Sequence, residues 1–341
     1  MASYPRVAGW GKYLPRKVLT NKDLESRLDT SDEWIFSRTG IRERRIASDD
    51  ETSSTMAVEA ARAALCCADV TPQDVDLIIV ATSTPESIFP ACAAYVQRGL
   101  GAHRAAAFDV NAACTGFIYA LATGWQFVAA GGYRNVLVIG SEVYSRILDW
   151  SDRATCILFG DGAGAVVLQR AEAPQGPSAF VLGNDGSGAG LLYVPGVCDR
   201  PAVATAKHYL SMNGAEVFRF AVSVTTEVTR QVLDAAGLDV DDIDLLIPHQ
   251  ANQRIISAAR RALGVPEEKV FVNVERLGNT SAASIPIALC EAAEQGRLRP
   301  GDRLVLVGFG GGLSWGGMLF SWQPVARQLQ AASVTDRQAE Q

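Results

Sequence analysis

One cysteine stands where a predicted strand passes into a predicted helix. Residues Ala105–Val110 predict a short buried strand, and apolar residues recur at helical spacing from Thr115 to about Ala130. Cys114 therefore lies at a helix N-terminus, where free backbone N–H groups and the positive end of the helix dipole are expected to lower the pKa of a thiol. This segment alone leaves two interpretations open, a nucleophile and a small buried apolar residue.

A histidine and an asparagine stand at two further predicted turns. His249 directly follows a strand that ends at Pro248; taken alone, it is as compatible with a structural histidine as with a functional one. Asn279 lies in a Gly-Asn-Thr turn before a helix predicted over 282–294. The chain has two other histidines, which we expect to be ordinary surface or edge residues: His103 and His208.

The composition narrows the class of protein. The chain has 341 residues, 48% hydrophobic and 20% charged, which suits one large domain or two closely packed halves. A net charge of −6 gives no reason to expect nucleic acid, and no apolar run has the length of a membrane span. The N-terminus lacks a secretory apolar stretch. Seven cysteines without a CxxC or a Cys/His cluster argue against disulfides and metal sites. We therefore expect a cytoplasmic protein without a bound metal.

The sequence contains an internal repeat. Residues 242–248 (DIDLLIP) match 74–80 (DVDLIIV), and residues 303–308 (RLVLVG) match 135–140 (NVLVIG). The offset is the same in both pairs, 244 − 76 = 168 and 308 − 140 = 168. Because strand and helix patterns alternate in each copy, we expect an α/β fold made of two duplicated halves.

The halves are assigned to 1–172 and 178–325, joined by a linker that contains proline and glycine, with a polar tail at 326–341. A pseudo-twofold arrangement of the halves would bring the His249 and Asn279 loops of the second half toward Cys114 of the first.

Two glycine-rich stretches do not fit a dinucleotide site. Gly160-Asp-Gly-Ala-Gly is predicted to be a turn between strands at 156–159 and 165–168, and the glycines after Gly308 also lead into a strand. A dinucleotide fingerprint needs a helix there to receive the pyrophosphate. We expect these glycines to let backbone pass close to a ligand or to the nucleophile.

Taken together, these segments resemble β-ketoacyl-acyl-carrier-protein synthase III, the initiating condensing enzyme of bacterial fatty-acid synthesis in the thiolase superfamily. The likeness runs from about Val7 to Trp322. It implies a thiolase-like five-layered αβαβα sandwich of two duplicated halves with mixed sheets, and a homodimer. The segments that carry it are 32–35, 38–44, 108–121, 159–165, 248–252, 278–284 and 308–315.

The resemblance implies a decarboxylative Claisen condensation by a ping-pong mechanism. Cys114 would take a short acyl group from acyl-CoA, while backbone N–H groups of Cys114 and Gly311 hold the oxyanion. His249 and Asn279 would donate hydrogen bonds to the thioester carbonyl of malonyl-acyl carrier protein and stabilise the enolate left by decarboxylation. The products would be 3-ketoacyl-acyl carrier protein, CoA and CO2, with no bound cofactor and no metal.

The resemblance also implies contacts for the two carriers. Trp34 and Arg153 would sandwich the CoA adenine with Arg38 near its phosphates, although a charge run such as 38–46 is by default a solvated face. Asn252 would contact the pantetheine arm. Arg254 and Arg261 would dock the carrier protein, whereas Arg260 is equally compatible with a solvated helix face. Phe89 would reach across the dimer and form the end wall of the partner's acyl pocket.

Three alternatives remain at the level of sequence. A quinolone- or polyketide-forming condensing enzyme or a non-decarboxylating acyltransferase shares the fold, but the joint presence of His249 and Asn279 favours decarboxylation. HMG-CoA synthase is disfavoured because the chain shows no motif for its glutamate acid. A non-catalytic scaffold that binds carrier protein is disfavoured by the intact Cys114, His249 and Asn279 set.

Overall fold

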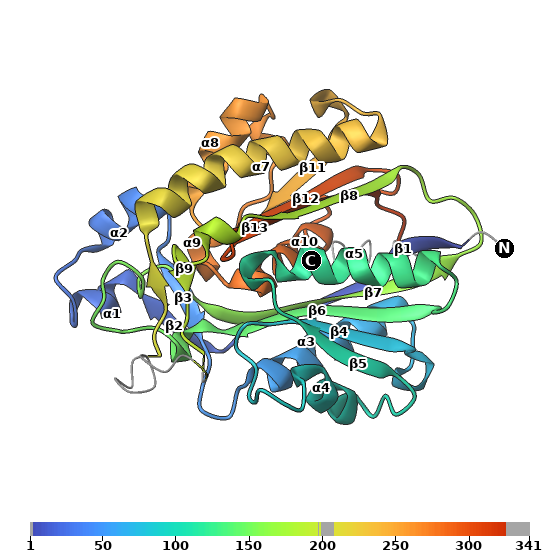
Figure 1. Ribbon diagram of the computed structural model, residues 1–341, viewed down its shortest axis with the longest axis horizontal. Coiled ribbons are helices and arrows are strands. Elements are labelled where there is room, and N and C mark those ends of the chain that lie inside the picture. The colour runs from blue at the N-terminus through green and yellow to red at the C-terminus, as the bar shows by residue number, and fades with distance from the viewer. Residues whose placement is uncertain (1–2, 197, 199–207, 325–341) are drawn as a thin grey trace, which may run out of the picture.

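Two mixed β-sheets with three layers of helices make up the computed structural model, which describes residues 3–196, 198 and 208–324 (Figure 1). The first sheet has the strand order β1-β7-β6-β4-β5 and the second β11-β12-β13-β8. Helices α5 and α10 lie between the sheets, α3 and α4 cover the outer face of the first, and α7 and α8 cover the outer face of the second. The predicted five-layered α/β sandwich is confirmed.

The elements of the first half follow the predicted alternation of strands and helices, with two short strands and a short helix before residue 47 that the sequence pattern did not predict. They are β1 (Tyr4–Tyr13), β2 (Lys17–Thr20), α1 (Asn21–Glu25), α2 (Asp32–Thr39), β3 (Glu43–Ile46), α3 (Ser53–Ala68), β4 (Leu77–Ala81), α4 (Cys92–Leu100), β5 (Ala106–Val110), α5 (Gly116–Ala129), β6 (Asn135–Val143) and β7 (Asp161–Ala171).

The second half repeats the alternation of strands and helices, with more differences in the number and length of the elements. It contains β8 (Ser178–Asn184), β9 (Leu192–Tyr193), β10 (Ser211–Met212), α7 (Gly214–Ala236), β11 (Leu245–Pro248), α8 (Gln253–Leu263), α9 (Val274–Leu277), α10 (Ser284–Glu294), β12 (Arg303–Gly310) and β13 (Ser314–Ser321). No helix in the parts of the chain described here is both long and apolar enough to cross a membrane.

The repeat seen in the sequence has a structural counterpart. Asp76 accepts hydrogen bonds from the backbone N–H groups of Arg134 and Asn135 at 2.8 and 2.9 Å, and so ties the start of β4 to the start of β6. Asp244 does the same between β11 and β12, accepting from Arg303 N at 2.7 Å. An aspartate at the equivalent position of each half therefore joins the two parallel strands, β4 to β6 in the first half and β11 to β12 in the second.

Two sequence predictions about local structure are wrong. Residues 156–158 form turns and Phe159 makes an isolated bridge to Asn279, while Gly160-Asp-Gly-Ala-Gly belongs mostly to the single strand β7 instead of to a turn between strands. The glycines are needed because α10 packs directly on β7: a Cβ at Gly164 would lie 2.6 Å from Ile287 N. Strand β5 is only half-buried, since it is the edge of its sheet and no strand covers its outer side.

The charge run at 38–46 is not a uniformly solvated face. Arg44 is fully buried and donates hydrogen bonds to Leu19 O, Asn21 Oδ1 and Ile157 O. Burial lowers the pKa of Arg44 to about 10, so the guanidinium stays charged and holds three segments together at neutral pH. Neighbouring Arg42 behaves as expected of a surface residue, with an ion pair to Asp32 at 2.8 Å.

Candidate active site

Cys114 lies in a tight turn between β5 and α5. The 3₁₀ turn Ala113–Thr115 precedes the helix, and Ala113 has a φ of 46°, in the left-handed region that non-glycine residues rarely adopt. The end of β12 presses on this turn from the other half: a Cβ at Gly310 would lie 2.8 Å from Cys114 N. The thiol is 4% exposed. The nucleophile is therefore buried at the contact between the two halves.

The prediction that Cys114 has a lowered pKa is wrong for the free protein. Burial raises the pKa of this thiol to about 12, and the nearby Ser281 side chain offsets this only in part. The helix behind the turn cannot compensate, because the thiolate would lose most of its contact with water. Cys114 is therefore a neutral thiol at rest.

His249 is buried beside the nucleophile and is also neutral. It follows β11, its backbone N–H donates to Val307 O at 2.8 Å, and its Nδ1 lies 2.6 Å from Ser284 Oγ. The ring meets Phe309 edge to face at 5.2 Å. Burial lowers the pKa of His249 to about 3. Because Nδ1 is engaged by Ser284, Nε2 is the nitrogen left for a ligand.

Asn279 is oriented by its own turn. Its Oδ1 accepts a hydrogen bond from Ser281 N at 2.8 Å, its N–H donates to Leu158 O at 2.9 Å, and its carbonyl oxygen accepts from Gly160 N at 3.0 Å. With the amide oxygen engaged, the NH2 group is the end of the side chain that can serve a ligand. Asn279 is therefore a fixed, neutral hydrogen-bond donor.

The Cys114 and Asn279 turns are related by the internal repeat. Among the described residues other than glycine, three have a positive φ: Asp69, Ala113 and Ser281. The last two are separated by the offset of the repeat, 281 − 113 = 168. Asn111 lies at the position that corresponds to Asn279, and its Oδ1 also accepts from the N–H two residues later, at 3.4 Å. One turn geometry thus presents the thiol in the first half and the amide in the second.

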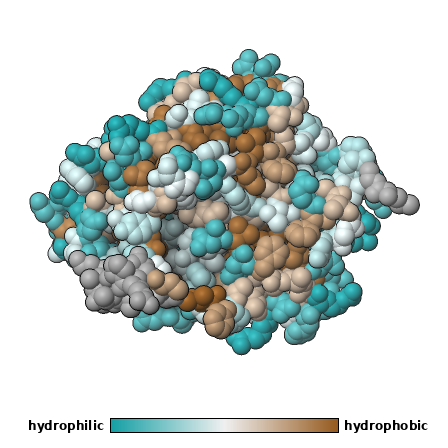
Figure 2. Space-filling model, viewed as in Figure 1, coloured by the Kyte–Doolittle hydropathy of each residue, from teal (hydrophilic) through white to brown (hydrophobic). Residues whose placement is uncertain are grey.

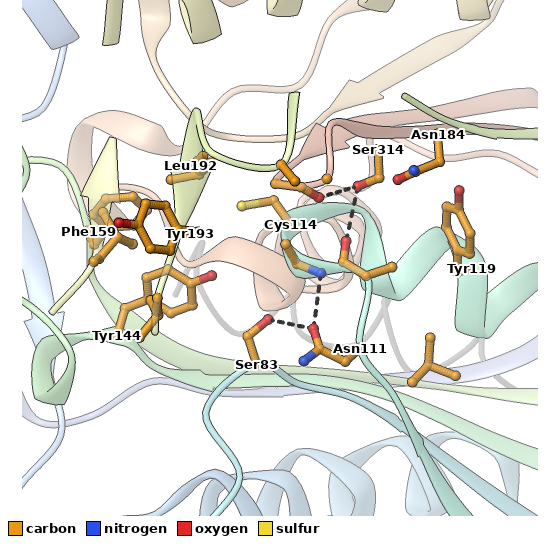
Figure 3. Close-up of a pocket in the computed structure, with 18 residues that line it drawn as sticks. Ser83, Asn111, Cys114, Tyr119, Tyr144, Phe159, Asn184, Leu192, Tyr193 and Ser314 are labelled. Atoms are coloured by element: carbon orange, nitrogen blue, oxygen red, sulfur yellow. Dashed lines mark hydrogen bonds between the residues drawn. The ribbon is translucent and has the colours of Figure 1, made fainter. Parts of the chain in front are cut away.

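Two cavities meet at Cys114. The first, of about 290 Å³, is lined by Cys114, His249, Asn279 and Phe309 and extends to Trp34 and Arg254. The second, of about 560 Å³, is lined by Cys114 with the side chains of Tyr144, Phe159, Leu192 and Tyr193. Figure 3 shows the Cys114 sulfur directed toward Phe159, Leu192 and Tyr193. A thiol at this junction can contact one substrate arm and one acyl chain at once.

Gly311 lies in the turn between β12 and β13 and lines the second cavity together with Cys114. A Cβ at this position would lie 2.8 Å from Leu192 O and 3.6 Å from the Ala113 side chain. Only glycine therefore allows the turn to approach the nucleophile this closely.

Three residues predicted to bind CoA surround the mouth of the first cavity. The Arg153 guanidinium lies 4.6 Å and that of Arg38 4.7 Å from the centre of the Trp34 ring. Arg153 is held there by Asp29, through its carboxylate at 3.8 Å and a hydrogen bond to its carbonyl oxygen. Helix α2 presents Trp34 because Ser31 caps the helix, accepting from Trp34 N at 3.1 Å.

Helix α8 carries the remaining predicted contacts. Asn252 caps the helix by accepting from Arg254 N at 2.8 Å, while its Nδ2 donates to Arg38 O at 3.1 Å, so it fixes the cavity mouth as well as lining it. Arg254 and Arg261 are exposed. Arg260 instead pairs with Glu267 at 3.5 Å and packs against the end of its own helix.

Phe89 does not line either cavity of its own chain. Its side chain is 84% exposed, and that of Ile88 is 71% exposed. The structure therefore leaves these two apolar side chains without cover from the described residues.

Sequence analysis missed a buried polar group behind the nucleophile. Glu142 is fully buried near the carboxyl end of β6, and Ser281 Oγ donates to its carboxylate at 3.2 Å. Tyr144 is buried against the same group and stacks on Phe159 at 5.0 Å. A signal was available: Glu142 is the only charged residue in a nine-residue strand whose other residues, apart from Asn135, are apolar or small.

Comparisons with known proteins place the chain among condensing enzymes. Family models described as 3-oxoacyl-[acyl-carrier-protein] synthase III and as its C-terminal part match residues 108–186 and 233–322. The chain is 53% identical over 321 residues to β-ketoacyl-[acyl-carrier-protein] synthase III of Desulfitobacterium hafniense Y51 and 55% identical over 321 residues to that of Symbiobacterium thermophilum, covering 93% of this chain and 97% of each relative.

The fold comparison agrees. The crystal structure of 3-oxoacyl-[acyl-carrier-protein] synthase III from Aquifex aeolicus VF5 matches with a TM-score of 0.88 and 49% identity, over 93% of this chain and all of that one.

Proposed function

The chain belongs to the β-ketoacyl-[acyl-carrier-protein] synthase III family, and we propose that its Cys114, His249 and Asn279 carry out the family reaction in two half-reactions. The protein is an acyltransferase that initiates fatty-acid synthesis by joining an acyl group from acyl-CoA to malonyl-acyl carrier protein. It needs no bound cofactor, because CoA arrives with the substrate. The role of each residue follows from its place in the site.

In the first half-reaction the Cys114 sulfur attacks the thioester carbon of acyl-CoA and CoA leaves. The oxyanion that forms accepts hydrogen bonds from the backbone N–H groups of Cys114 and Gly311, which lie at the contact between the α5 turn and the β12–β13 turn. The acyl chain then occupies the cavity lined by Tyr144, Phe159 and Leu192.

In the second half-reaction malonyl-acyl carrier protein reaches the same thioester through the other cavity. His249 Nε2 and the Asn279 NH2 donate to its thioester carbonyl, so loss of CO2 leaves an enolate between two neutral donors. A protonated imidazole would transfer its proton to the carbanion. Burial lowers the pKa of His249 and keeps the imidazole neutral, so this proton transfer does not occur. The convergence of Cys114, His249 and Asn279 on one cavity is the observation that carries this proposal.

The CoA nucleotide would bind at the mouth of that cavity. Adenine would enter between the Trp34 ring and the Arg153 guanidinium, which contact each other in the free protein. Arg38 would then turn toward the phosphates, and Asn252, at the cap of α8, would contact the pantetheine arm. Arg254 and Arg261, both exposed on α8, would receive the acidic carrier protein.

Exposed apolar surface supports a homodimer. Beside the uncovered edge strand β5, a hollow of about 440 Å³ is lined by Phe127, Phe180 and Leu182, each more than one third exposed. Figure 2 shows hydrophobic surface on this face, over β8 and alongside α5. Phe89 and Ile88 extend from the loop after β4. A second copy would cover these groups and would place Phe89 in the partner's acyl cavity.

Residues 1–172 and 178–325 act in this proposal as two halves of one catalytic unit, since the first supplies the thiol and the second supplies both enolate donors. The tail at 326–341 lies outside the described residues. All seven cysteines are free, which supports a cytoplasmic location.

Mass spectrometry tests the proposal directly. After mixing with acetyl-CoA, the wild-type protein should gain one acetyl group on the peptide that contains Cys114, and it should lose that group when malonyl-acyl carrier protein is added. Cys114→Ser should gain none, because a hydroxyl in this buried turn is a far weaker acid than a thiol. Acetyl on Cys66 or Cys156, with the Cys114 peptide unmodified, would refute the assignment.

A further inference from the structure

The two half-reactions leave one proton unassigned. Cys114 must lose its proton to attack acyl-CoA, and its thiolate must regain one when the condensation product leaves. Burial makes the thiol a weak acid, so neither step can rely on a thiolate standing free in the site. A group that takes the proton and returns it is required near the sulfur.

Glu142 is placed to do this. One carboxylate oxygen accepts from Thr84 Oγ1 at 2.7 Å, Ser83 N at 3.0 Å and Thr82 Oγ1 at 3.3 Å. The other accepts from Ser281 Oγ at 3.2 Å. The first oxygen is thus held by the loop after β4, while the second faces the turn that begins at Asn279.

Ser281 links this carboxylate to the nucleophile. Its hydroxyl donates to Glu142, and the turn that contains it packs directly against the Cys114 turn, where Ser281 lowers the pKa of the thiol. Its backbone N–H orients Asn279 at the same time. A hydroxyl donates one hydrogen and accepts others. Ser281 can therefore accept the thiol proton while it passes its own to Glu142.

Few other groups near Glu142 can change charge. Cys114 and Tyr144 are the titratable groups beside it, and burial raises the pKa of each. Cys92 on α4 also feels its charge and has a raised pKa. On β7, the Asp161 carboxylate is turned to Ala47 N and Ser145.

The helices that pack on β6 place few titratable groups near Glu142. The buried faces of α3 and α5 contain no acidic, basic or histidine residue. Helix α10 buries Cys290 and Glu291, which lie in its second turn, well beyond the end that meets Ser281.

The site therefore has a single group that titrates near neutrality. Burial raises the pKa of Glu142 to about 7, whereas the pKa of His249 is about 3 and that of Cys114 about 12. At neutral pH the carboxylate is populated in both forms, as a group that alternates between base and acid must be.

We propose that Glu142 accepts the Cys114 proton during acylation and returns it during condensation, with the Ser281 hydroxyl carrying it in both directions. This inference rests on the proposed function, because it assigns the proton of those two half-reactions. In this relay the proton passes between Glu142 and the sulfur through Ser281.

In acylation, the Cys114 proton passes to Ser281 Oγ and the Ser281 proton to Glu142 as the S–C bond forms. The bond from the acyl carbon to the CoA sulfur breaks, and the CoA thiolate takes a proton from solvent. The uphill transfer from thiol to carboxylate is concerted with S–C bond formation.

In condensation, the malonyl C–CO2 bond breaks, its electron pair forms the enolate, and the enolate carbon bonds to the acyl carbon. The Cys114 thiolate that leaves takes a proton back from Ser281, which regains one from Glu142. The protein returns to a neutral thiol and an ionised carboxylate, with one solvent proton consumed per turnover, on CoA.

Single-turnover rates of the two half-reactions between pH 5.5 and 9 test this. The wild-type acylation rate should rise with pH and level off above about pH 7, while the condensation rate should fall above about pH 7. Glu142→Gln should lose both inflections and slow each step on the order of 10²-fold. Ser281→Ala should do the same while keeping the N–H that orients Asn279.

Thr84→Val is the matched control. It removes a hydrogen bond that lowers the pKa of Glu142 but leaves Ser281 in place, so both inflections should remain and move to higher pH. Folded Glu142→Gln or Ser281→Ala protein with unchanged inflections would overturn the inference. Wild-type protein that never acetylates Cys114 would instead overturn the proposed function, before any pH series.

Discussion

At the scale of single residues, burial outweighs the helix dipole in setting the charge of the nucleophile. A helix N-terminus stabilises a nearby anion by about 0.3–1 kcal/mol, and up to ~2 kcal/mol where the anion is partly buried. The shift of the Cys114 pKa from 9 to about 12 corresponds to roughly 4 kcal/mol against the thiolate. The site must therefore generate the thiolate only during the reaction.

Removing one enolate donor at a time should separate the half-reactions. His249→Ala and Asn279→Ala each delete one neutral donor, a change that typically costs on the order of 10²–10³ in rate. Both variants should still acetylate Cys114 from acetyl-CoA but should fail to release CO2 from malonyl-acyl carrier protein. Radiolabelled CO2 release measures the second step. Condensation by Asn279→Ala at the wild-type rate would contradict its assigned role.

His249 should also make the folded protein sensitive to acid. Its pKa is about 3 when folded and 6.5 when exposed, so between these values the unfolded chain binds the extra proton and stability falls as pH falls. Glu142, with its raised pKa, acts in the opposite direction between 4.5 and about 7, losing stability as pH rises.

The pH ranges in which His249 and Glu142 affect stability overlap. The contribution of His249 should therefore be measured as the difference in stability between the wild-type protein and a variant that lacks the imidazole. His249→Gln lacks it, and its stability relative to wild type should therefore improve by about 2 kcal/mol between pH 6.5 and 4.5. Urea unfolding of both proteins at the two pH values measures this change. A constant difference would mean that His249 titrates normally when folded.

At the scale of elements, α8 joins two functions along one helix. Its first turn lines the substrate cavity through Asn252 and Arg254, and Arg254 also stacks on Phe218 at 5.6 Å. Its last turn exposes Arg261, about ten residues further on. Substitutions along this helix should therefore affect the CoA substrate and the carrier-protein substrate to different degrees.

Charge reversal at Arg261 should weaken the carrier-protein substrate selectively. Arg261→Glu should raise KM for malonyl-acyl carrier protein several-fold at low salt, and the effect should shrink as salt screens the contact. Acetylation by acetyl-CoA should change little. Arg104→Glu, an exposed arginine between α4 and β5, is the control with the same change in charge. Equal effects of the two reversals would place the docking surface elsewhere.

At the scale of the whole molecule, the acyl cavity reaches Ser83 in the loop after β4 and Val110 at the end of the edge strand β5, which a second copy would cover in the proposed dimer. If Phe89 of that copy closes it, the ring sets the length of the acyl group. Each further methylene could gain about 0.8 kcal/mol from burial, but forcing it against a packed ring costs about 1–3 kcal/mol. Starters of two to four carbons are therefore expected to be preferred.

Phe89→Thr should shift that preference toward longer chains without loss of Cys114 acylation. Single-turnover acylation with acetyl-, hexanoyl- and decanoyl-CoA measures it, and gel filtration of both proteins tests whether the dimer persists. Wild-type protein that accepts decanoyl-CoA as fast as acetyl-CoA would show that Phe89 is not the end of the cavity.

The sequence by itself determined the duplicated α/β architecture and the turns that carry Cys114, His249 and Asn279. These features depend on short-range signals: apolar periodicity, a proline that ends a strand, a glycine-containing turn before a helix, and the same offset between two pairs of strands. Apart from the offset, which compares two short segments 168 residues apart, each signal lies within about fifteen residues and reflects the local chain geometry that its element requires.

Only the tertiary structure decided which groups lose contact with water. The raised pKa of Cys114, the neutral His249 and the buried Arg44 all depend on segments remote in the chain that close over them. Glu142 lies beside Cys114 because the carboxyl end of the central strand β6 meets the Ser281 turn, and Glu142 and Ser281 are 139 residues apart in the chain. Desolvation is a sum over such long-range contacts, and no local pattern records it.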